Sequence, residues 1–276
     1  MRTLSWRCSM TLNKDAVILI TGASQGIGFE LAQQFQSLGY RVVGVARNLP
    51  KSKVSFDAQI MDVTKMETIE QTTTYIQKKY GRLDVLINNA GYGIAGPIEE
   101  TPLSAVKQLY DVNVFGMHQV TQACLPLLKK SSGLILNIGS VAGDFTIPFQ
   151  TFYSMTKSSV ATYSEGLRLE LKPLGVRVVN VKPGDTKSNF SSQRQKFTKP
   201  KSPYQARTSR SLAVMEKDEK NGLPASLVFK VCNRILHQKN PPSHVTVGFS
   251  YRVMQGLKKI LPNRLVLWLI YQIYGK

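Results

Sequence analysis

The chain has 276 residues and a formal net charge of +19, with 42% hydrophobic and 19% charged residues. This composition excludes a disordered chain, and the length suits a single α/β domain. The three cysteines lie far apart and show no CxxC or Cys/His metal spacing, so we expect reduced thiols and no metal site. Reduced thiols fit a cytoplasmic location.

The positive charge is concentrated in the last third of the chain. Residues 190–276 contain 16 Lys and Arg against 3 Asp and Glu, a net charge of +13, whereas residues 1–189 have a net charge of +6. Nucleic acid, an anionic lipid surface and an anionic substrate could each explain this bias. The basic residues show no nucleic-acid recognition motif and no interleaved aromatic platform, so we expect no nucleic-acid partner.

Residues 1–14, MRTLSWRCSMTLNK, are basic and lack acids. They contain no apolar segment long enough for a signal peptide. We interpret residues 1–14 as a flexible extension, with a short mitochondrial-type presequence as the alternative.

From residue 15 onward, short apolar runs alternate with longer helical patterns. Runs of this kind suit strands buried on both faces of a parallel sheet, and their alternation with helices predicts right-handed βαβ units. The predicted fold class is therefore α/β, a single doubly wound Rossmann-type parallel sheet with helices on both faces, spanning residues 15–249. Strands are predicted at 16–20, 41–46, 58–63, 83–89, 133–140 and 176–184, and helices at 26–39, 66–81, 102–130 and 150–171.

After residue 190 the sequence becomes polar, basic and Pro-containing, which predicts a mobile loop over 191–210 within a substrate loop at about 190–222. Further helices are predicted at 224–238 and within 250–276, with a final strand at 244–249.

The glycine-rich stretch TGASQGIG, Thr21 to Gly28, lies between the first strand and its helix. Glycines at Gly22, Gly26 and Gly28 permit a tight turn and let backbone N–H groups approach a pyrophosphate at the helix N-terminus. A glycine-rich turn without a ligand is the alternative.

The end of the second strand bears on the choice of cofactor. An acidic residue in this region would hold the ribose 2′-hydroxyl of NAD, but the sequence has Ala46 and Arg47 there. A guanidinium can bind a 2′-phosphate through two hydrogen bonds, so Arg47 favours NADP(H). The alternative is a solvated arginine at a strand end.

Polar residues gather at the carboxyl ends of later strands, the edge where open α/β sheets bind ligands. NNAG ends the fourth strand at Gly91, and NIGS ends the fifth at Ser140. Tyr153 and Lys157 follow four residues apart, on one face of a helix, and Asn113 lies within the preceding long helix. Taken separately, these residues could be an Asn turn, a Ser cap and a surface Tyr–Lys pair. Because they all lie at the same edge of the predicted sheet, we expect them to form one site.

These motifs, in this order between residues 16 and 190, resemble the short-chain dehydrogenase/reductase superfamily. The resemblance implies hydride transfer between a nicotinamide cofactor and a carbonyl or alcohol. It implies that Tyr153 donates a proton to the carbonyl oxygen and that Ser140 hydrogen-bonds the same oxygen. Lys157 would lower the pKa of Tyr153 and hold the nicotinamide ribose, while Asn113 would support a water path to Lys157.

The same resemblance implies a cofactor site. Asp62 and Val63 would flank the adenine, and Pro183 and Gly184 would meet the nicotinamide carboxamide. The residues expected to bind NADP(H) are Gly22, Ser24, Gln25, Gly26, Ile27, Gly28, Arg47, Asp62, Val63, Asn89, Ala90, Gly91, Tyr153, Lys157, Pro183, Gly184 and Thr186.

Two features bear on the substrate. Several basic residues could draw in a phosphate-bearing substrate: Arg194, Lys196, Lys199, Lys201, Arg207 and Arg210. The tail, residues 250–276, is apolar, flanked by Arg and Lys, broken by Pro262 and too short to span a bilayer. It suits an interfacial helix with Trp268, Tyr271 and Tyr274 near headgroups, or a helix packed over the substrate pocket or in a homodimer interface.

The basic segment that contains Arg194 to Arg210 and the apolar tail, residues 250–276, together resemble the lipid-active members of the superfamily, especially 1-acyldihydroxyacetone-phosphate reductases. Members that act on 17β-hydroxysteroids or retinol are near alternatives. We therefore expect a lipophilic carbonyl or alcohol substrate and a peripheral membrane or lipid-droplet surface as partner. A non-catalytic NADPH-binding protein is a further alternative, which the complete Asn–Ser–Tyr–Lys set disfavours.

Overall fold

The computed structural model describes residues 13–50, 52–187 and 190–276 and gives no side-chain description of Ser191 and Ser192. The extension expected at residues 1–14 therefore lies almost entirely outside the described residues.

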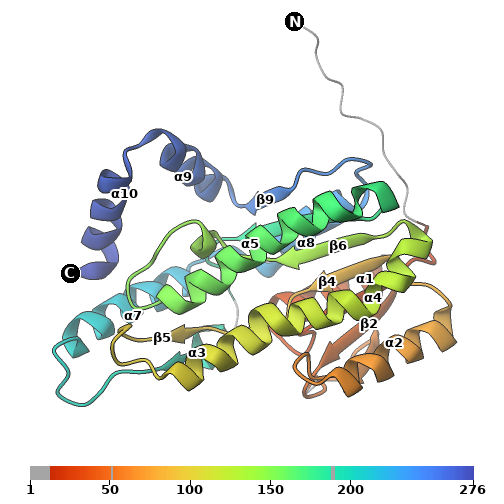
Figure 1. Ribbon diagram of the computed structural model, residues 1–276, viewed down its shortest axis with the longest axis horizontal. Coiled ribbons are helices and arrows are strands. Elements are labelled where there is room, and N and C mark those ends of the chain that lie inside the picture. Colours follow the sequence, from red (N-terminus) through yellow and green to blue (C-terminus); the bar gives the residue numbers. More distant parts are fainter. Residues whose placement is uncertain (1–12, 51, 188–189) are drawn as a thin grey trace, which may run out of the picture.

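A seven-stranded sheet forms the centre of the molecule (Figure 1), and every strand pairs in parallel with its neighbours. The strand order is β3-β2-β1-β4-β6-β7-β9. The prediction of a doubly wound parallel sheet is confirmed. The chain reverses direction across the sheet between β1 and β4, which places a ligand-binding crevice at their carboxyl ends. The strands are β1 (Val17–Thr21), β2 (Arg41–Ala46), β3 (Asp57–Ile60), β4 (Val85–Asn88), β6 (Leu134–Ile138), β7 (Arg177–Pro183) and β9 (His244–Val247).

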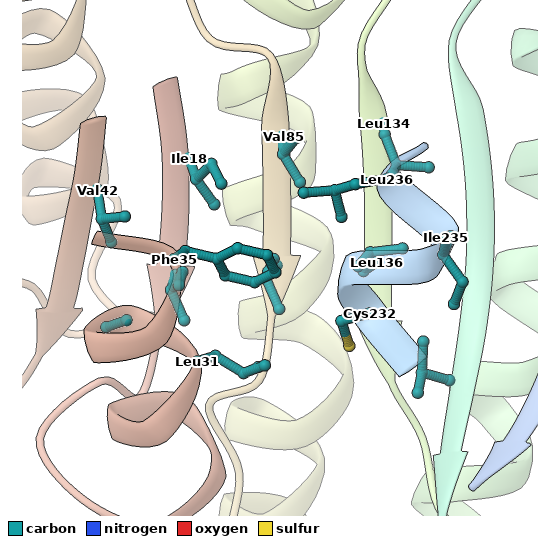
Figure 2. Close-up of a cluster of buried hydrophobic side chains, with 14 of the residues drawn as sticks. Ile18, Leu31, Phe35, Val42, Val85, Leu134, Leu136, Cys232, Ile235 and Leu236 are labelled. Carbon is teal, nitrogen blue, oxygen red and sulfur yellow. The ribbon is translucent and has the colours of Figure 1, made fainter. Parts of the chain in front are cut away.

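Two helices cover one face of the sheet, α1 (Gly26–Ser37) and α8 (Ala225–Leu236). Figure 2 shows Leu31 and Phe35 of α1 and Cys232 of α8 directed at strand residues such as Ile18. All four side chains are fully buried, because β1, β4 and β6 are apolar on both faces.

The opposite face carries α2 (Met66–Tyr80), α4 (Met117–Ser131) and α5 (Thr151–Leu171). The helix α3 (Leu103–Tyr110) continues into α4 through a π-helical turn, η1 (Asp111–Gly116). Short helices η2 (Val141–Gly143) and η3 (Lys172–Leu174) flank α5. Two helical layers over one buried sheet hold the strand ends rigidly in place.

The segment after β7 differs from the sequence prediction. It forms α6 (Phe190–Gln193), a strand β8 (Gln195–Lys196) paired with β5 (Ile94–Ala95), and the 16-residue helix α7 (Gln205–Lys220). The mobile loop predicted over 191–210 is therefore wrong where it overlaps α6, β8 and the first turns of α7. Its buried stripe mixes short polar residues with Leu212 and Met215, which pack against Ala95, Ile147 and Tyr274, so the sequence looks polar throughout.

The chain ends in a bent arm beyond the sheet (Figure 1), made of α9 (Phe249–Ile260), α10 (Asn263–Ile270) and η4 (Tyr271–Gly275). The predicted break at Pro262 is confirmed: Leu261 is extended, as a residue before proline prefers. No residue of α9 is buried, and only Val266 of α10 is. Among the described residues, none of the helices has the length and hydropathy required to traverse a bilayer.

Candidate active site

A single continuous cavity of about 450 Å³ runs along the carboxyl edge of the sheet, from the glycine loop to the C-terminal arm. It brings together almost every residue that the sequence assigned to the site. Asn113 and Gly28 are the exceptions, and both support the lining from behind. The predicted residues that line it are Gly22, Ser24, Gln25, Gly26, Ile27, Arg47, Asp62, Val63, Asn89, Ala90, Gly91, Ser140, Tyr153, Lys157, Pro183, Gly184 and Thr186.

The glycine loop has a conformation that needs its glycines. Gly22 and Gly26 have φ of 70° and 60°, in the left-handed region. A Cβ at Gly28 would collide with the carbonyl oxygen of Gly22, so α1 can approach the loop only with glycine there. The first turn of α1 holds no acidic residue, which leaves its N-terminus free to bind an anion such as a pyrophosphate.

Thr21 fixes this loop to the NNAG segment, and sequence reasoning did not include it in the site. Its hydroxyl accepts hydrogen bonds from the backbone N–H groups of Asn89 and Ala90, both at 2.9 Å. The Asn89 amide donates to the carbonyl oxygens of Thr21 and Gly22 at 3.0 and 3.3 Å. The two walls of the crevice are therefore tied together before any ligand binds. A threonine at the end of a buried strand is the only sequence signal.

Arg47 lies exposed at the rim of the cavity, directly after β2. In the part of the chain that the structure describes, it forms no ion pair. Asp62 lies across the same pocket; burial raises the pKa of its carboxyl, but hydrogen bonds from the backbone N–H and hydroxyl of Thr64 and the charge of Arg47 outweigh this, so the pKa is lowered. The guanidinium remains available for an anionic ligand group.

Asn113 lies in the π-helical turn η1 and is buried. Its Nδ2 donates to the Tyr92 carbonyl oxygen at 3.0 Å and to the Thr156 hydroxyl at 3.1 Å, and its Oδ1 accepts from the Tyr92 N–H. Both amide donors are thus engaged with protein. The side chain joins the NNAG loop to α5, one residue before Lys157, and π-turns of this kind recur at functional sites.

The Ser140–Tyr153–Lys157 group is built from two parts of the chain, the segment after β6 and the helix α5. Ser140 follows β6 and caps η2, with its Oγ accepting from the Ala142 N–H at 3.0 Å, and it also hydrogen-bonds Tyr153. Tyr153 and Lys157, both 7% exposed, project from the first turns of α5. The Lys157 ammonium lies 5.7 Å from the Tyr153 ring centre and donates to the Ile138 carbonyl oxygen at 2.9 Å.

Burial dominates the protonation of this pair. It raises the pKa of Tyr153, an effect that the Ser140 hydrogen bond and the charge of Arg194 only partly offset. Burial also lowers the pKa of Lys157 from 10.5 to about 8. The pKa of Tyr153 is therefore raised in this structure, not lowered as the resemblance to the family implied. The phenol keeps its proton at neutral pH, which is the state that a proton donor needs.

The far wall of the cavity is apolar and was missed by the sequence analysis, because its residues come from four separate segments. Phe145 and Ile147 follow η2, while the other residues belong to α7 and the C-terminal arm: Met215, Met254, Ile270, Ile273 and Tyr274. The end of the arm therefore lies over the pocket, which was one of the alternatives for the tail.

Tyr251 of α9 closes the same wall near the end of β7. Its hydroxyl donates to Asp185 Oδ2 at 2.7 Å and accepts from the Asp185 N–H at 3.1 Å. A Cβ at Gly184 would collide with the Tyr251 ring. Gly184 is thus required for α9 to pack against the strand.

Several of the basic residues expected to attract a phosphate are engaged inside the protein. Arg194 is buried in an ion pair with Glu219, and Lys196 pairs with Glu216 at 2.7 Å. Arg207 Nε donates to the Gly275 carbonyl oxygen at 2.8 Å. The positive charge at the substrate end of the cavity is consequently smaller than the sequence count suggests.

A dinucleotide-type crevice beside a Ser–Tyr–Lys site defines an oxidoreductase that acts on CH–OH and C=O groups. The chain belongs to the short-chain dehydrogenase family, whose model matches residues 16–199. The sequence prediction of this family is confirmed.

Known relatives share both sequence and fold. A 3-ketodihydrosphingosine reductase of Bacteroides thetaiotaomicron is 36% identical over 94% of this chain and 98% of its own length. An NADPH-dependent 1-acyldihydroxyacetone phosphate reductase of Saccharomyces cerevisiae is 34% identical over 62% of this chain and 63% of its own. A solved short-chain dehydrogenase from Streptomyces avermitilis has a TM-score of 0.79 and 27% identity, covering 92% of this chain and 96% of that one.

Proposed function

We propose that the protein reduces a ketone on a long-chain lipid, with NADPH as the hydride donor. The single observation that carries this proposal is the shape of the cavity, in which Tyr153 and Ser140 lie between the glycine loop and an apolar wall. A cofactor occupying the glycine-loop end leaves the apolar end for a hydrocarbon chain. The near full-length similarity to a reductase of a long-chain keto lipid supports the same assignment.

The choice of NADPH rests on Arg47. Its guanidinium is exposed at the rim of the cavity, at the position where an NAD-binding site would hold an acidic residue. A 2′-phosphate would provide the acceptor that this guanidinium lacks within the described chain. The NADPH dependence in the name of the yeast relative agrees with this.

The chain's own residues supply the proton and the positioning. NADPH, when bound, supplies the hydride that adds to the carbonyl carbon. Tyr153 donates its phenolic proton to the carbonyl oxygen, and Ser140 hydrogen-bonds that oxygen, so the developing negative charge is stabilised. Lys157, one turn away, provides the charge that makes the phenolate less unfavourable after transfer.

A phosphate-bearing ketone such as acyl-dihydroxyacetone phosphate is the second candidate. It is favoured by the yeast relative and by Arg194, whose Nε and Nη1 lack hydrogen-bond partners among the described residues. The engagement of Arg194, Lys196 and Arg207 within the protein weighs against it. Steroid or retinoid ketones are further candidates that the apolar wall could also receive.

We further propose that the arm contacts an anionic lipid surface. Its apolar side chains are unusually exposed: Phe249 is 75%, Ile260 81% and Trp268 55% exposed. The exposed residues Lys259 and Arg264 lie among them, which matches anionic headgroups. The same arm lines the cavity through Ile270, Ile273 and Tyr274, so the apolar surface and the pocket are continuous.

A panel of ketones followed by NADPH absorbance tests the reductase proposal. We expect long-chain keto lipids to be reduced, and Tyr153→Phe to lower kcat by about a hundredfold or more while NADPH binding, measured by fluorescence titration, persists. The proposal fails if wild-type protein that binds NADPH reduces no lipid ketone. Near-normal turnover by Tyr153→Phe would remove Tyr153 from the role of proton donor.

A further inference from the structure

We infer that Asp185 and Glu219 form a subsite for a protonated amine next to the ketone, so that the protein selects long-chain 2-amino ketones. This inference rests on the proposed lipid-ketone reduction and specifies which headgroup accompanies the ketone.

Both carboxylates belong to the wall of the catalytic cavity. Asp185 lies in the turn after β7, and Glu219 lies in the last turn of α7, so two separate elements place them there. Burial is the main cause of the raised pKa of Tyr153, and the negative charges of both carboxylates raise it further, so they lie within electrostatic range of the phenol. A charged group bound between them would lie close to the carbonyl carbon.

One of these carboxylates has spare hydrogen-bonding capacity. Glu219 uses Oε1 to bind Arg194, while its buried Oε2 has no hydrogen-bond partner in the described residues. Asp185 accepts from Tyr251 on Oδ2. Burial raises the pKa of both carboxyl groups, and each is raised further by a neighbouring acid, Asp218 or Asp185. Buried acceptors that repel each other are stabilised by a cationic donor, and an ammonium has three N–H groups to offer.

The arrangement of charge favours a cation over a phosphate. Asp185 and Glu219 line the cavity, whereas Arg194 does not. The Arg194 side chain is 0% exposed and lies over the Phe190 ring, 5.6 Å from its centre, so its guanidinium is not open to the cavity. Asp218, which accepts from the Tyr274 hydroxyl at 3.1 Å, adds a further negative charge nearby. An incoming phosphate would meet carboxylates before it met the guanidinium.

The spacing of a 2-amino ketone matches this arrangement. Its ammonium is attached to the carbon beside the carbonyl carbon, so placing the carbonyl oxygen on Tyr153 and Ser140 brings the ammonium to the same depth of the pocket. The alkyl chain leaves from the other side of the carbonyl group. The cavity lining includes Phe145, Ile147 and Ile273, apolar residues that can receive it.

The test compares 3-ketosphinganine with its N-acetyl derivative, which keeps the ketone and chain but loses the positive charge. We expect wild-type kcat/KM to be at least about tenfold higher for the amine. Asp185→Asn and Glu219→Gln should each lower kcat/KM for the amine by about tenfold to a hundredfold, the range for a hydrogen bond to a charged group, and change the N-acetyl value by less than about threefold.

Glu216→Gln is the matched control, since Glu216 lies on α7 one turn before Glu219, pairs with Lys196 and does not line the cavity. The Glu216→Gln variant should have wild-type kcat/KM for both ketones. Thermal unfolding and NADPH titration check each variant. Glu219→Gln leaves Arg194 without its ion-pair partner and could prevent folding. In that case Asp185→Asn, which keeps the Arg194–Glu219 ion pair, tests the amine subsite alone.

The outcomes separate the two proposals. If wild-type protein reduces no lipid ketone, the proposed function fails. If it reduces both ketones with equal kcat/KM, if Asp185→Asn keeps the wild-type preference, or if acyl-dihydroxyacetone phosphate is the better substrate, the amine subsite is overturned while the reductase assignment stands.

Discussion

Lys157 carries an ammonium that the fold buries beside the Tyr153 ring, and this burial should destabilise the protein. The lowering of its pKa from 10.5 to about 8 corresponds to a cost of about 3 kcal/mol for holding the charged form. Below about pH 8 the folded and unfolded states are both protonated, so the cost is present in full. Between about pH 8 and 10.5 only the unfolded state keeps the proton, so stability from this group rises with pH.

Lys157→Met keeps the apolar stem and removes the charge. We expect the variant to be inactive but more stable than wild type at pH 7, by up to about 3 kcal/mol, with the difference shrinking by pH 10.5. Urea unfolding of both proteins at several pH values measures this. A variant that is less stable at pH 7, or a difference independent of pH, would contradict it.

Arg47 carries the cofactor prediction. Arg47→Asp replaces attraction with repulsion of a 2′-phosphate, so we expect KM for NADPH to rise by about tenfold or more, with KM for NADH changed far less. Arg41→Asp provides a matched control, because Arg41 begins the same strand at its opposite end and does not line the cavity. Wild-type preference for NADH would show that Arg47 has another role.

The residues with a motif around them could be predicted from sequence, and those without one could not. Ser140, Tyr153 and Lys157 stand in fixed spacing, and the structure places all three on one cavity. Asp185 and Glu219 have no such signal, since a carboxylate in a polar segment looks like any solvated acid. Their importance arises only when α7 folds over the end of β7.

At the scale of the secondary-structure element, the packing of helix α9 against the end of β7 depends on Gly184. Gly184→Ala would push the Tyr251 ring away from the end of β7, because a Cβ there has no room. We expect a loss of about 1–3 kcal/mol in unfolding free energy, typical of overpacking, together with a raised KM for the lipid substrate. Chemical denaturation and steady-state kinetics measure the two effects.

A second substitution separates steric overlap from other causes. Adding Tyr251→Ala to Gly184→Ala removes the ring that collides, so the double variant should be no less stable than Tyr251→Ala alone. Additive losses would mean that Gly184 matters for a reason unrelated to α9.

Helix α7 shows why the substrate half was harder to predict than the sheet. Its buried positions are Thr208, Ser211, Leu212 and Met215, a stripe in which half the residues are polar. A helix is recognised in a sequence by the difference in polarity between its buried face and its exposed face, and in α7 this difference is small. The central strands β1, β4 and β6, by contrast, are mostly apolar because helices cover both faces of the sheet, so their runs stand out.

At the scale of the whole molecule, the arm gives the protein an exposed apolar surface next to its pocket. We expect the protein to float with anionic liposomes, and added salt to weaken binding only in part, since burial of Trp268 and its neighbours is not screened. Replacing Phe249, Ile260 and Trp268 together by Ser should abolish flotation. Protein that stays at the bottom of the gradient, or that forms a dimer burying these side chains, would favour the packing alternative.

The overall fold could be predicted because alternating apolar strands and helices allow few topologies. The arm's position could not, since contacts such as Tyr274 with Asp218 and Arg207 with Gly275 join segments more than 50 residues apart. Such pairs become neighbours only through the fold of everything between them.

The strand order also has a consequence for biosynthesis. In the order of synthesis, β2 pairs with β1, β3 with β2, β4 with β1, β6 with β4, β7 with β6, and β9 with β7. Each new strand therefore finds its partner already made, and the sheet can grow outward while the ribosome is still extending the chain. The C-terminal arm follows β9 and emerges after the sheet is complete, so its exposed apolar side chains appear only when every strand of this sheet already has a partner.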